Sequence, residues 1–175
     1  HNAIIDGLVR GGCTATVVLF VGERGFVAHV GDSRLALVRD GRLERLTVDH
    51  RPSNKAEADA VRARGGVVLS FGGRDPRVNG VIAITRALGD RVLQPFVCAP
   101  PMYRRVALVP EDEFVVLACD GVWDVVSDER AVRVVREALA QTRSPQLAAL
   151  ALRDWAFSSG SSDNITAIVL QLPKQ

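Results

Sequence analysis

The sequence predicts an α+β fold built on antiparallel sheets. Its first part holds several short runs of apolar and β-branched residues, separated by glycine, proline and aspartate, as is typical of strands joined by tight turns. The second half holds two stretches in which apolar residues recur at helical spacing, and then a last strand pattern. Because strands and helices do not alternate regularly, this pattern favours an α+β arrangement over a doubly wound parallel sheet.

The first strands are expected to form two hairpins. Residues 15–23 and 25–33 are rich in apolar and β-branched side chains and are joined by a turn that contains glycine. Residues 34–47 alternate apolar and polar side chains on both sides of Asp40-Gly41, a dipeptide that supplies the positive φ angles of a two-residue type I′ turn. The second hairpin is the clearest turn signal in the sequence.

A short helix and further strands are expected in the middle of the chain. Residues 55–66 contain helix formers and close on Gly65, which suits the left-handed position just after a helix. Turn-forming residues separate the apolar runs that follow. These runs predict strands at 66–70, 78–85, 103–109 and 113–119.

Two helices and a final strand are expected in the second half. Ser127 precedes two acidic residues and predicts the start of one helix, because its hydroxyl can cap the first turn and the acids favour the helix dipole. Ser144-Pro145 predicts the start of another helix, which runs to about Ser158. Residues 164–172 predict the last strand.

Composition and charge exclude several classes of protein. The 175 residues are 47% hydrophobic and 5% aromatic, which fits one globular domain. The net charge of +2 comes from charges mixed along the chain, so neither nucleic acid nor a membrane surface is indicated as a partner. No apolar run approaches the roughly 20 residues that span a bilayer. Three widely spaced cysteines support neither a disulfide framework nor a zinc site, and we expect an intracellular location, in the cytoplasm or nucleus.

Three aspartates share one local setting. Asp32, Asp120 and Asp163 each lie at the edge of an apolar strand, beside a small or turn-forming residue. Any one of them alone is more often a turn residue that accepts backbone N–H groups. If the strands converge, however, two carboxylates about 4 Å apart repel by roughly 4 kcal/mol at an effective dielectric near 20, and need a proton or a cation. Oxygen-only ligands favour Mg²⁺ or Mn²⁺ over zinc.

Such a metal centre would suit the hydrolysis of a phosphate ester, because carboxylate-bound metals generate hydroxide near neutral pH and hold a phosphate. Arg34, Arg77 and Arg86 lie beside strands or glycine turns and are candidates for phosphate contacts, although surface arginines are common. His29 alternates with apolar neighbours and is interpreted as a satisfied strand residue. The residues alone therefore leave two readings open, a metal-dependent phosphohydrolase or ordinary turn carboxylates.

Six blocks of the sequence occur in a specific order: GGCTAT, VAHVGDSRLALVRDGRLERLTVDHRPSN, RARGG, RVNGVIAITRALGD, FVVLACDGVWDVVSDERAV and GSSDNITAIVLQL. Together they resemble the protein phosphatase 2C family of metal-dependent serine/threonine phosphatases over residues 11–172. The resemblance implies a sandwich of two antiparallel β-sheets flanked by helices, with metal ions in a cleft at one end. It also implies that a metal-bound water, and no catalytic side chain, attacks phosphoserine or phosphothreonine in a protein substrate.

The resemblance also assigns site residues. Asp120 matches a ligand of one of the two core metals, and Asp163 matches a second such ligand. Asp32 and Asp124 match residues that hold a weaker third metal together with Asp120. Arg77 matches a basic residue near the phosphate. The expected cofactors are Mg²⁺ or Mn²⁺, as two ions with a third in some states.

The chain departs from the family pattern at its start. Family members carry, upstream of the block that matches GGCTAT, a hairpin with a phosphate-binding arginine and a D-G-H-G-G block with the bridging aspartate and the proposed general acid. Neither Asp6 nor His1 can take these roles. Since the first residue is also not methionine, we expect residues 1–175 to be the C-terminal part of a single phosphatase 2C-type domain in a longer protein, and to be inactive alone.

Two functions therefore stay open. The chain is either part of an active phosphatase, which the four retained aspartates favour, or a pseudophosphatase or interaction module on the same fold, which the missing bridging aspartate favours. The expected partners are a phosphoprotein substrate and either the N-terminal segment of the same domain or another covering partner. The covering segment is expected because strand edges left unpaired promote aggregation.

Overall fold

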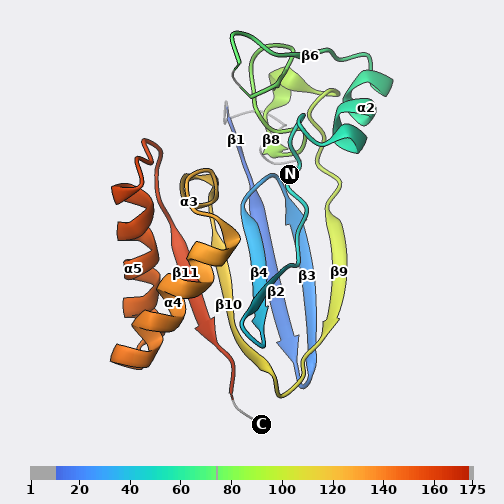
Figure 1. The fold of residues 1–175 in the computed structure, drawn as a ribbon. Helices are drawn as coiled ribbons and strands as arrows, with labels where there is room; N and C mark the ends of the chain where they lie inside the picture. The colour runs from blue at the N-terminus through green and yellow to red at the C-terminus, as the bar shows by residue number, and fades with distance from the viewer. Residues whose placement is uncertain (1–10, 74, 174–175) are drawn as a thin grey trace. The chain divides into compact units, whose positions relative to one another are not determined.

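The computed structural model describes residues 11–73 and 75–173, and its elements confirm the predicted mixture of antiparallel sheets and helices (Figure 1). The strands are β1 Gly12–Cys13, β2 Ala15–Val21, β3 Arg24–Val30, β4 Arg34–Arg39, β5 Arg42–Arg45, β6 Val68–Leu69, β7 Arg77–Val78, β8 Leu88–Gly89, β9 Met102–Ala107, β10 Asp112–Ala118 and β11 Ala167–Gln171. The helices are α2 Lys55–Ala63, the 3₁₀ turn η1 Arg91–Leu93, α3 Asp120–Trp123, α4 Asp128–Thr142 and α5 Pro145–Ser158.

The chain divides into two compact units, each with its own core. Among the described residues, the first unit comprises 11–17, 28–32, 48–73 and 75–103, and the second comprises 18–27, 33–47 and 104–173. The core of the first unit gathers apolar residues of α2 and of the segments that follow it, with Val61, Val78, Ala87 and Val97 at its centre. The two larger cores belong to the second unit.

The second unit is a sheet sandwich with helices on one outer face. Its main sheet has the order β11-β10-β4-β5, with antiparallel pairing throughout. One face of this sheet packs against α3, α4 and α5 through the core that includes Phe114, Val116 and Leu152 (Figure 1). The other face packs, through Leu35 and Val115, against apolar residues of β2, β3 and β9. The predicted sandwich of two sheets flanked by helices is therefore confirmed.

Local sequence signals explain where two helices begin and where one hairpin turns. Ser127 Oγ accepts a hydrogen bond from Arg130 N and caps α4, and Ser144 Oγ does the same for Leu147 N at the start of α5. Asp40 and Gly41 have φ angles of 49° and 75°, as the type I′ turn between β4 and β5 requires. These predictions are confirmed.

Three predicted strands are shorter than expected. Instead of 78–85, β7 comprises only Arg77–Val78, because Asn79 and Gly80 take left-handed φ angles of 51° and 73° and reverse the chain. The run at 66–70 contributes only Val68–Leu69, which pairs with β7. The last strand begins at Ala167 and not at 164.

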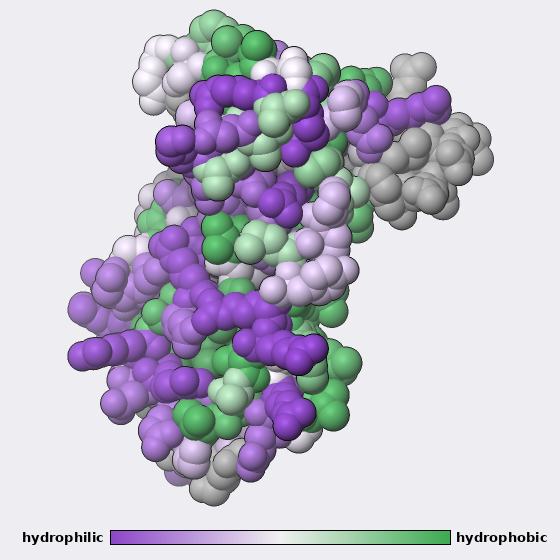
Figure 2. Space-filling view, turned by 90° about the vertical axis from the view of Figure 1, so that its right-hand side faces the viewer, coloured by the Kyte–Doolittle hydropathy of each residue, from purple (hydrophilic) through white to green (hydrophobic). Residues whose placement is uncertain are grey.

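One face of β2 stays largely exposed among the described residues. Val17, Leu19 and Val21 are 58%, 59% and 58% exposed, whereas the alternate residues Val18 and Phe20 pack in the sandwich core. Elsewhere, hydrophilic and hydrophobic residues are interspersed over the face drawn in Figure 2. In the part of the chain that the structure describes, helices are too short or too polar to cross a bilayer.

Candidate functional site

Two of the predicted site residues lie on adjacent loops of the second unit. Asp120 begins α3 directly after β10, and Asp163 precedes β11. Because β10 and β11 are antiparallel, with Ala118 opposite Ala167, the end of one strand lies beside the start of the other. Asp120 is half-buried and Asp163 is exposed. The topology thus brings two carboxylate-bearing loops to the same end of the main sheet.

Direct contacts tie these two loops together beyond the last pair of the ladder. Cys119 N donates to Thr166 O at 3.2 Å, and Ser161 Oγ donates to the carbonyl oxygen of Gly121 at 2.7 Å. A Cβ placed on Gly121 would lie 2.2 Å from Asn164 O, so only glycine fits between the loops. We call this set of residues, Cys119, Gly121, Ser161, Asn164 and Thr166, the loop junction.

Asp163 and Asp124 are held by their local backbone. Asp163 Oδ1 accepts a hydrogen bond from Asn164 N at 2.6 Å, which fixes the orientation of its carboxylate. Asp124 closes α3, where its N–H donates to Asp120 O at 2.9 Å, and its side chain is exposed. The four-residue spacing sets Asp120 and Asp124 one helical turn apart on the same side.

Asp32 has a different setting, in the first unit. It is only 5% exposed, and its Oδ2 accepts a hydrogen bond from Arg51 Nε at 2.7 Å. Burial raises the pKa of the Asp32 carboxyl above its usual range, while the Arg51 guanidinium opposes that rise. The preceding Gly31 has a φ of +98°, and a Cβ there would lie 2.3 Å from Thr14 Cγ2. The backbone at Asp32 therefore depends on a glycine.

A stacked histidine pair supports the Asp32 loop. The rings of His29 and His50 are 4.4 Å apart and parallel, and His50 Nδ1 accepts a hydrogen bond from Gly31 N at 3.0 Å. Because Nδ1 accepts, the neutral His50 ring carries its proton on Nε2. Burial lowers the pKa of both histidines, and that of His50 falls to about 4. His29 also contacts Val48 O, which confirms its interpretation as a satisfied strand residue.

The candidate arginines make contacts within their own units. Arg34 donates to Asp128 and lies over the Trp123 ring, which identifies it as a structural residue of the second unit. Arg86 forms an ion pair with the buried Glu57. Burial opposes ionisation of Glu57, but hydrogen bonds from Arg86 and Thr85 outweigh it and lower the pKa.

The predicted phosphate-binding arginine lies on a short strand of the first unit. Arg77 is exposed, and its Nη1 donates to Val81 O at 2.7 Å. This hydrogen bond orients the guanidinium on the turn that follows β7. The role of Arg77 in binding phosphate stays a prediction.

The donor set fits a divalent ion only in part. Among the described residues, no group of three His, Cys, Asp or Glu side chains has a geometry that could hold a metal ion. Mg²⁺, however, is often bound through one or two carboxylates while it keeps several waters, and Mn²⁺ also favours oxygen ligands. Asp120 and Asp163, on adjacent loops, supply that kind of pair. The ligand roles of Asp32, Asp120, Asp124 and Asp163 stay predictions.

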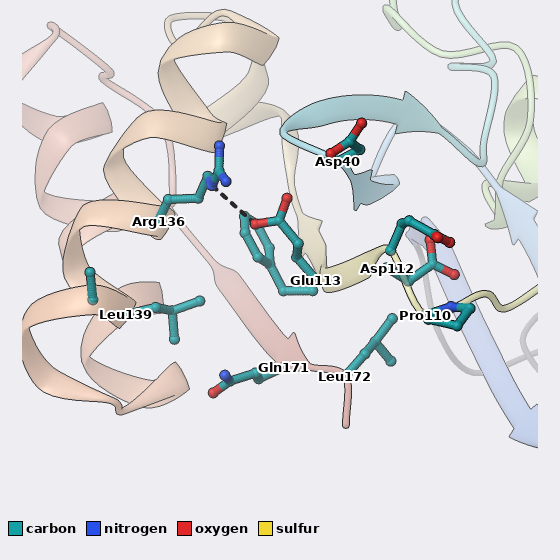
Figure 3. Close-up of a pocket in the computed structure, with 11 residues that line it drawn as sticks. Asp40, Pro110, Asp112, Glu113, Arg136, Leu139, Gln171 and Leu172 are labelled. Atoms are coloured by element: carbon teal, nitrogen blue, oxygen red, sulfur yellow. Dashed lines mark ion pairs between the residues drawn. The ribbon is translucent and has the colours of Figure 1, made fainter. Parts of the chain in front are cut away.

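A separate pocket of about 620 Å³ lies in the second unit at the other end of β10. Asp40, the start of β10 and residues of α4 line it, and Glu113 and Arg136 form an ion pair at 3.0 Å across it (Figure 3). None of the predicted metal or phosphate ligands lines this pocket.

Sequence reasoning missed several supporting residues. Cys119 directly precedes a predicted ligand and ends an apolar strand, and this position was its only sequence signal. Arg51 and His50 lie in the turn-rich segment VDHRPSN, where nothing in the local pattern indicates that they contact the Asp32 loop.

The sequence was compared with models of known protein families. The model for Protein phosphatase 2C matches residues 7–165, which is most of the chain. The chain belongs to the protein phosphatase 2C family. It is 42% identical over 160 residues to "Probable protein phosphatase 2C 7" of Oryza sativa subsp. japonica, covering 91% of this chain and 41% of that protein. It is 41% identical over 170 residues to "Protein phosphatase 2C homolog 1" of Schizosaccharomyces pombe, covering 93% of this chain and 46% of the relative.

Solved structures of the family have the same fold. A sex determining protein of C. elegans superimposes with a TM-score of 0.85 at 32% identity, over 94% of this chain and 41% of the other. Serine-threonine phosphatase 2C of Toxoplasma gondii gives a TM-score of 0.78 at 26% identity, over 93% and 58% of the respective chains. The chain thus spans less than two thirds of the length of the relatives that it matches.

Proposed function

We propose that this chain is the C-terminal part of the single domain of a metal-dependent protein serine/threonine phosphatase. One observation carries the proposal: in a chain of the phosphatase 2C family, Asp120 and Asp163 lie on adjacent loops that the loop junction holds together. The relatives from Oryza sativa and Toxoplasma gondii are named as phosphatases, the second as a serine-threonine phosphatase. We therefore propose that the substrates of this protein are proteins that carry phosphoserine or phosphothreonine.

In this proposal each aspartate has a separate role. Asp120 and Asp163 hold the core Mg²⁺ or Mn²⁺ ions, and Asp124 and Asp32 each act as a further oxygen ligand for a divalent ion. When bound, the metal would act as a Lewis acid, which activates water and offsets the negative charge of the phosphate. The main chain of the loop junction presents the two core carboxylates before any ion arrives, which lowers the cost of ordering them. Arg77 binds a phosphate oxygen.

The proposal includes a covering segment and a location. The exposed side chains Val17, Leu19 and Val21 form an apolar face on β2, and burying such residues stabilises a protein by roughly 25 cal/mol per Å². We propose that the N-terminal segment of the same domain, or another partner, covers this face. The protein acts inside the cell, in the cytoplasm or nucleus.

The test is Mn²⁺-dependent hydrolysis of a phosphothreonine peptide by the full-length protein. Asp120→Asn is expected to lower kcat/KM at least about 100-fold, because it removes a ligand charge at the metal. The matched control is Asp154→Asn, an exposed aspartate of α5 that pairs with Arg153, and it should keep full activity. Equal rates for wild type and Asp120→Asn would contradict the role of Asp120.

A pseudophosphatase is the alternative, and one observation favours it: the described residues contain no group of three metal-ligating side chains. The two functions differ in one assay. A full-length protein that binds Mn²⁺ but turns over no phosphothreonine peptide at any metal concentration would be a pseudophosphatase. We expect turnover by the full-length protein and none by residues 1–175 alone; robust Mn²⁺-dependent turnover by these 175 residues would contradict the second expectation.

A further inference from the structure

We propose that Cys119 is a positioning residue, whose thiol fixes the spacing of the two metal-ligating loops. This inference rests on the proposed function. Cys119 directly precedes Asp120, and its sulfur contacts Asn164, which directly follows Asp163, and Thr166, two residues further on. The thiol is therefore one residue away from one proposed ligand and joined to the loop of the other.

The sulfur acts as both donor and acceptor in the structure. Cys119 Sγ donates to Asn164 O at 3.1 Å and accepts from Thr166 N at 3.2 Å. A thiol has one S–H donor and a weak acceptor sulfur, so these two contacts use both functions of the side chain. Both partners are main-chain atoms, so the thiol constrains the backbone of the loop and not only a side chain.

The place of these contacts indicates why they matter. The regular pairing of β10 with β11 ends at Ala118 and Ala167, so the sheet itself does not hold the residues beyond them. The thiol and the hydrogen bond from Cys119 N to Thr166 O continue the connection past the sheet. Without them fewer contacts would order the loop from Asp163 to Thr166 before the metal binds, and more of the cost of ordering it would fall on metal binding.

A simple packing role is less consistent with this setting. Cys119 is half-buried, and burial alone does not require its sulfur to contact two main-chain atoms of the other loop. Ser161, from the other side of the loop junction, makes a parallel contact to the carbonyl of Gly121 at 2.7 Å. Two side chains that bind main-chain atoms across the same pair of loops indicate that the junction fixes geometry.

The test measures Mn²⁺ affinity of the full-length protein, by electron paramagnetic resonance of free Mn²⁺, together with thermal unfolding without metal. Loss of a residue that orients metal ligands typically costs 10- to 100-fold in affinity, and because thiol hydrogen bonds are weak we expect about a tenfold loss for Cys119→Ala. Cys119→Ser keeps a donor and an acceptor and should bind within about threefold of wild type. Cys98→Ala, a half-buried cysteine of the first unit, is the matched control and should bind as wild type does.

Two results would overturn the positioning role. One is wild-type Mn²⁺ affinity in Cys119→Ala. The other is a tenfold loss in a folded Cys119→Ser, which also decides the matter if the alanine variant does not fold. Asp120→Asn separates this failure from that of the proposed function: if it binds Mn²⁺ as tightly as wild type, the metal site itself is wrong, whatever Cys119 does.

Discussion

The loop after β10 in the second unit and the loop after β3 in the first unit both present an aspartate at a strand end, but they hold it in opposite ways. Asp120 is half-buried and Asp163 exposed, and main-chain contacts across the loop junction set their positions. Asp32 is buried and already forms an ion pair with Arg51. Similar sequence patterns thus place aspartates in different environments: one is buried in an ion pair, and the others lie on loops set by main-chain contacts.

This difference teaches that a strand-end aspartate has two possible counter-ions. Where the protein supplies an arginine, as Arg51 does for Asp32, the guanidinium offsets part of the cost of burying the carboxylate, and removing one partner of the pair is expected to destabilise the fold. Where main-chain contacts set the loop and the carboxylate stays exposed, as at Asp163, its oxygen atoms are of the kind that Mg²⁺ and Mn²⁺ favour as ligands. We therefore expect substitutions in the second unit's loops to weaken metal binding, and substitution of Asp32 to lower the stability of the metal-free protein.

The largest expected effect is on metal binding by the second unit. Asp163→Asn should weaken Mn²⁺ binding at least about 100-fold in the full-length protein, because it removes a charged ligand, while metal-free unfolding changes little because the side chain is exposed. Calorimetric titration with Mn²⁺ and a thermal melt in chelator measure the two quantities. If Asp163→Asn instead lowered the stability of the metal-free protein strongly and left Mn²⁺ binding intact, Asp163 would be a structural residue and not a metal ligand.

A smaller effect, and of the other kind, is expected at Asp32. Asp32→Asn should lower the metal-free free energy of unfolding by about 2 kcal/mol, because the largely buried Arg51 guanidinium loses the charged carboxylate that accepts its hydrogen bond. Mn²⁺ affinity should fall less than tenfold. Denaturant unfolding in chelator gives the first number. Asp59→Asn, an exposed aspartate of the same unit, is the control and should leave the free energy of unfolding nearly unchanged.

Acid is expected to weaken the first unit through His50. Burial lowers its pKa to about 4 in the folded state, from about 6.5 for a free histidine, so the folded state disfavours the extra proton. The stabilisation is complete above pH 6.5 and is lost as the pH falls toward 4, by about 2 kcal/mol at most after allowance for solvent screening.

Amide hydrogen exchange at Gly31 measures this loss where it arises, because Gly31 N donates to His50. His50→Gln keeps a side-chain acceptor but does not titrate, so protection at Gly31 should depend less steeply on pH in that variant. The same pH dependence in both proteins would exclude His50 as the cause.

The smallest expected effect is that of Arg77, whose guanidinium is exposed and already bonded to Val81 O. Arg77→Ala should raise KM for a phosphothreonine peptide about threefold and leave kcat nearly unchanged, as expected for loss of uniform binding. Arg62→Ala, an exposed arginine of α2, is the control. A 100-fold fall in kcat without a change in KM would place Arg77 at the transition state.

Local signals predicted much of the fold. The Asp40-Gly41 turn, the serine caps of α4 and α5 and the apolar, β-branched run of β2 each depend on a few neighbouring residues, so the sequence shows them. Asn79-Gly80 is also a turn signal and could have predicted that β7 ends at Val78. The apolar residues on both sides of this dipeptide instead favoured a continuous strand.

The site was less predictable, because its contacts are distant in sequence. The order of motifs pointed to Asp120 and Asp163, but the thiol that joins their loops contacts residues 45 and 47 positions away. The hydrogen bond of Arg51 to Asp32 spans 19 positions, and that of His50 to Gly31 spans the same number. Such partners follow from the register of strands and loops, which no local pattern encodes.

One measurement tests the central claim most directly: anomalous diffraction at the manganese edge from crystals of the full-length protein grown with Mn²⁺. We predict an anomalous peak in direct contact with the carboxylate of Asp120, and a peak, the same or adjacent, in contact with that of Asp163. Manganese bound elsewhere, with neither carboxylate as a ligand, would contradict the account.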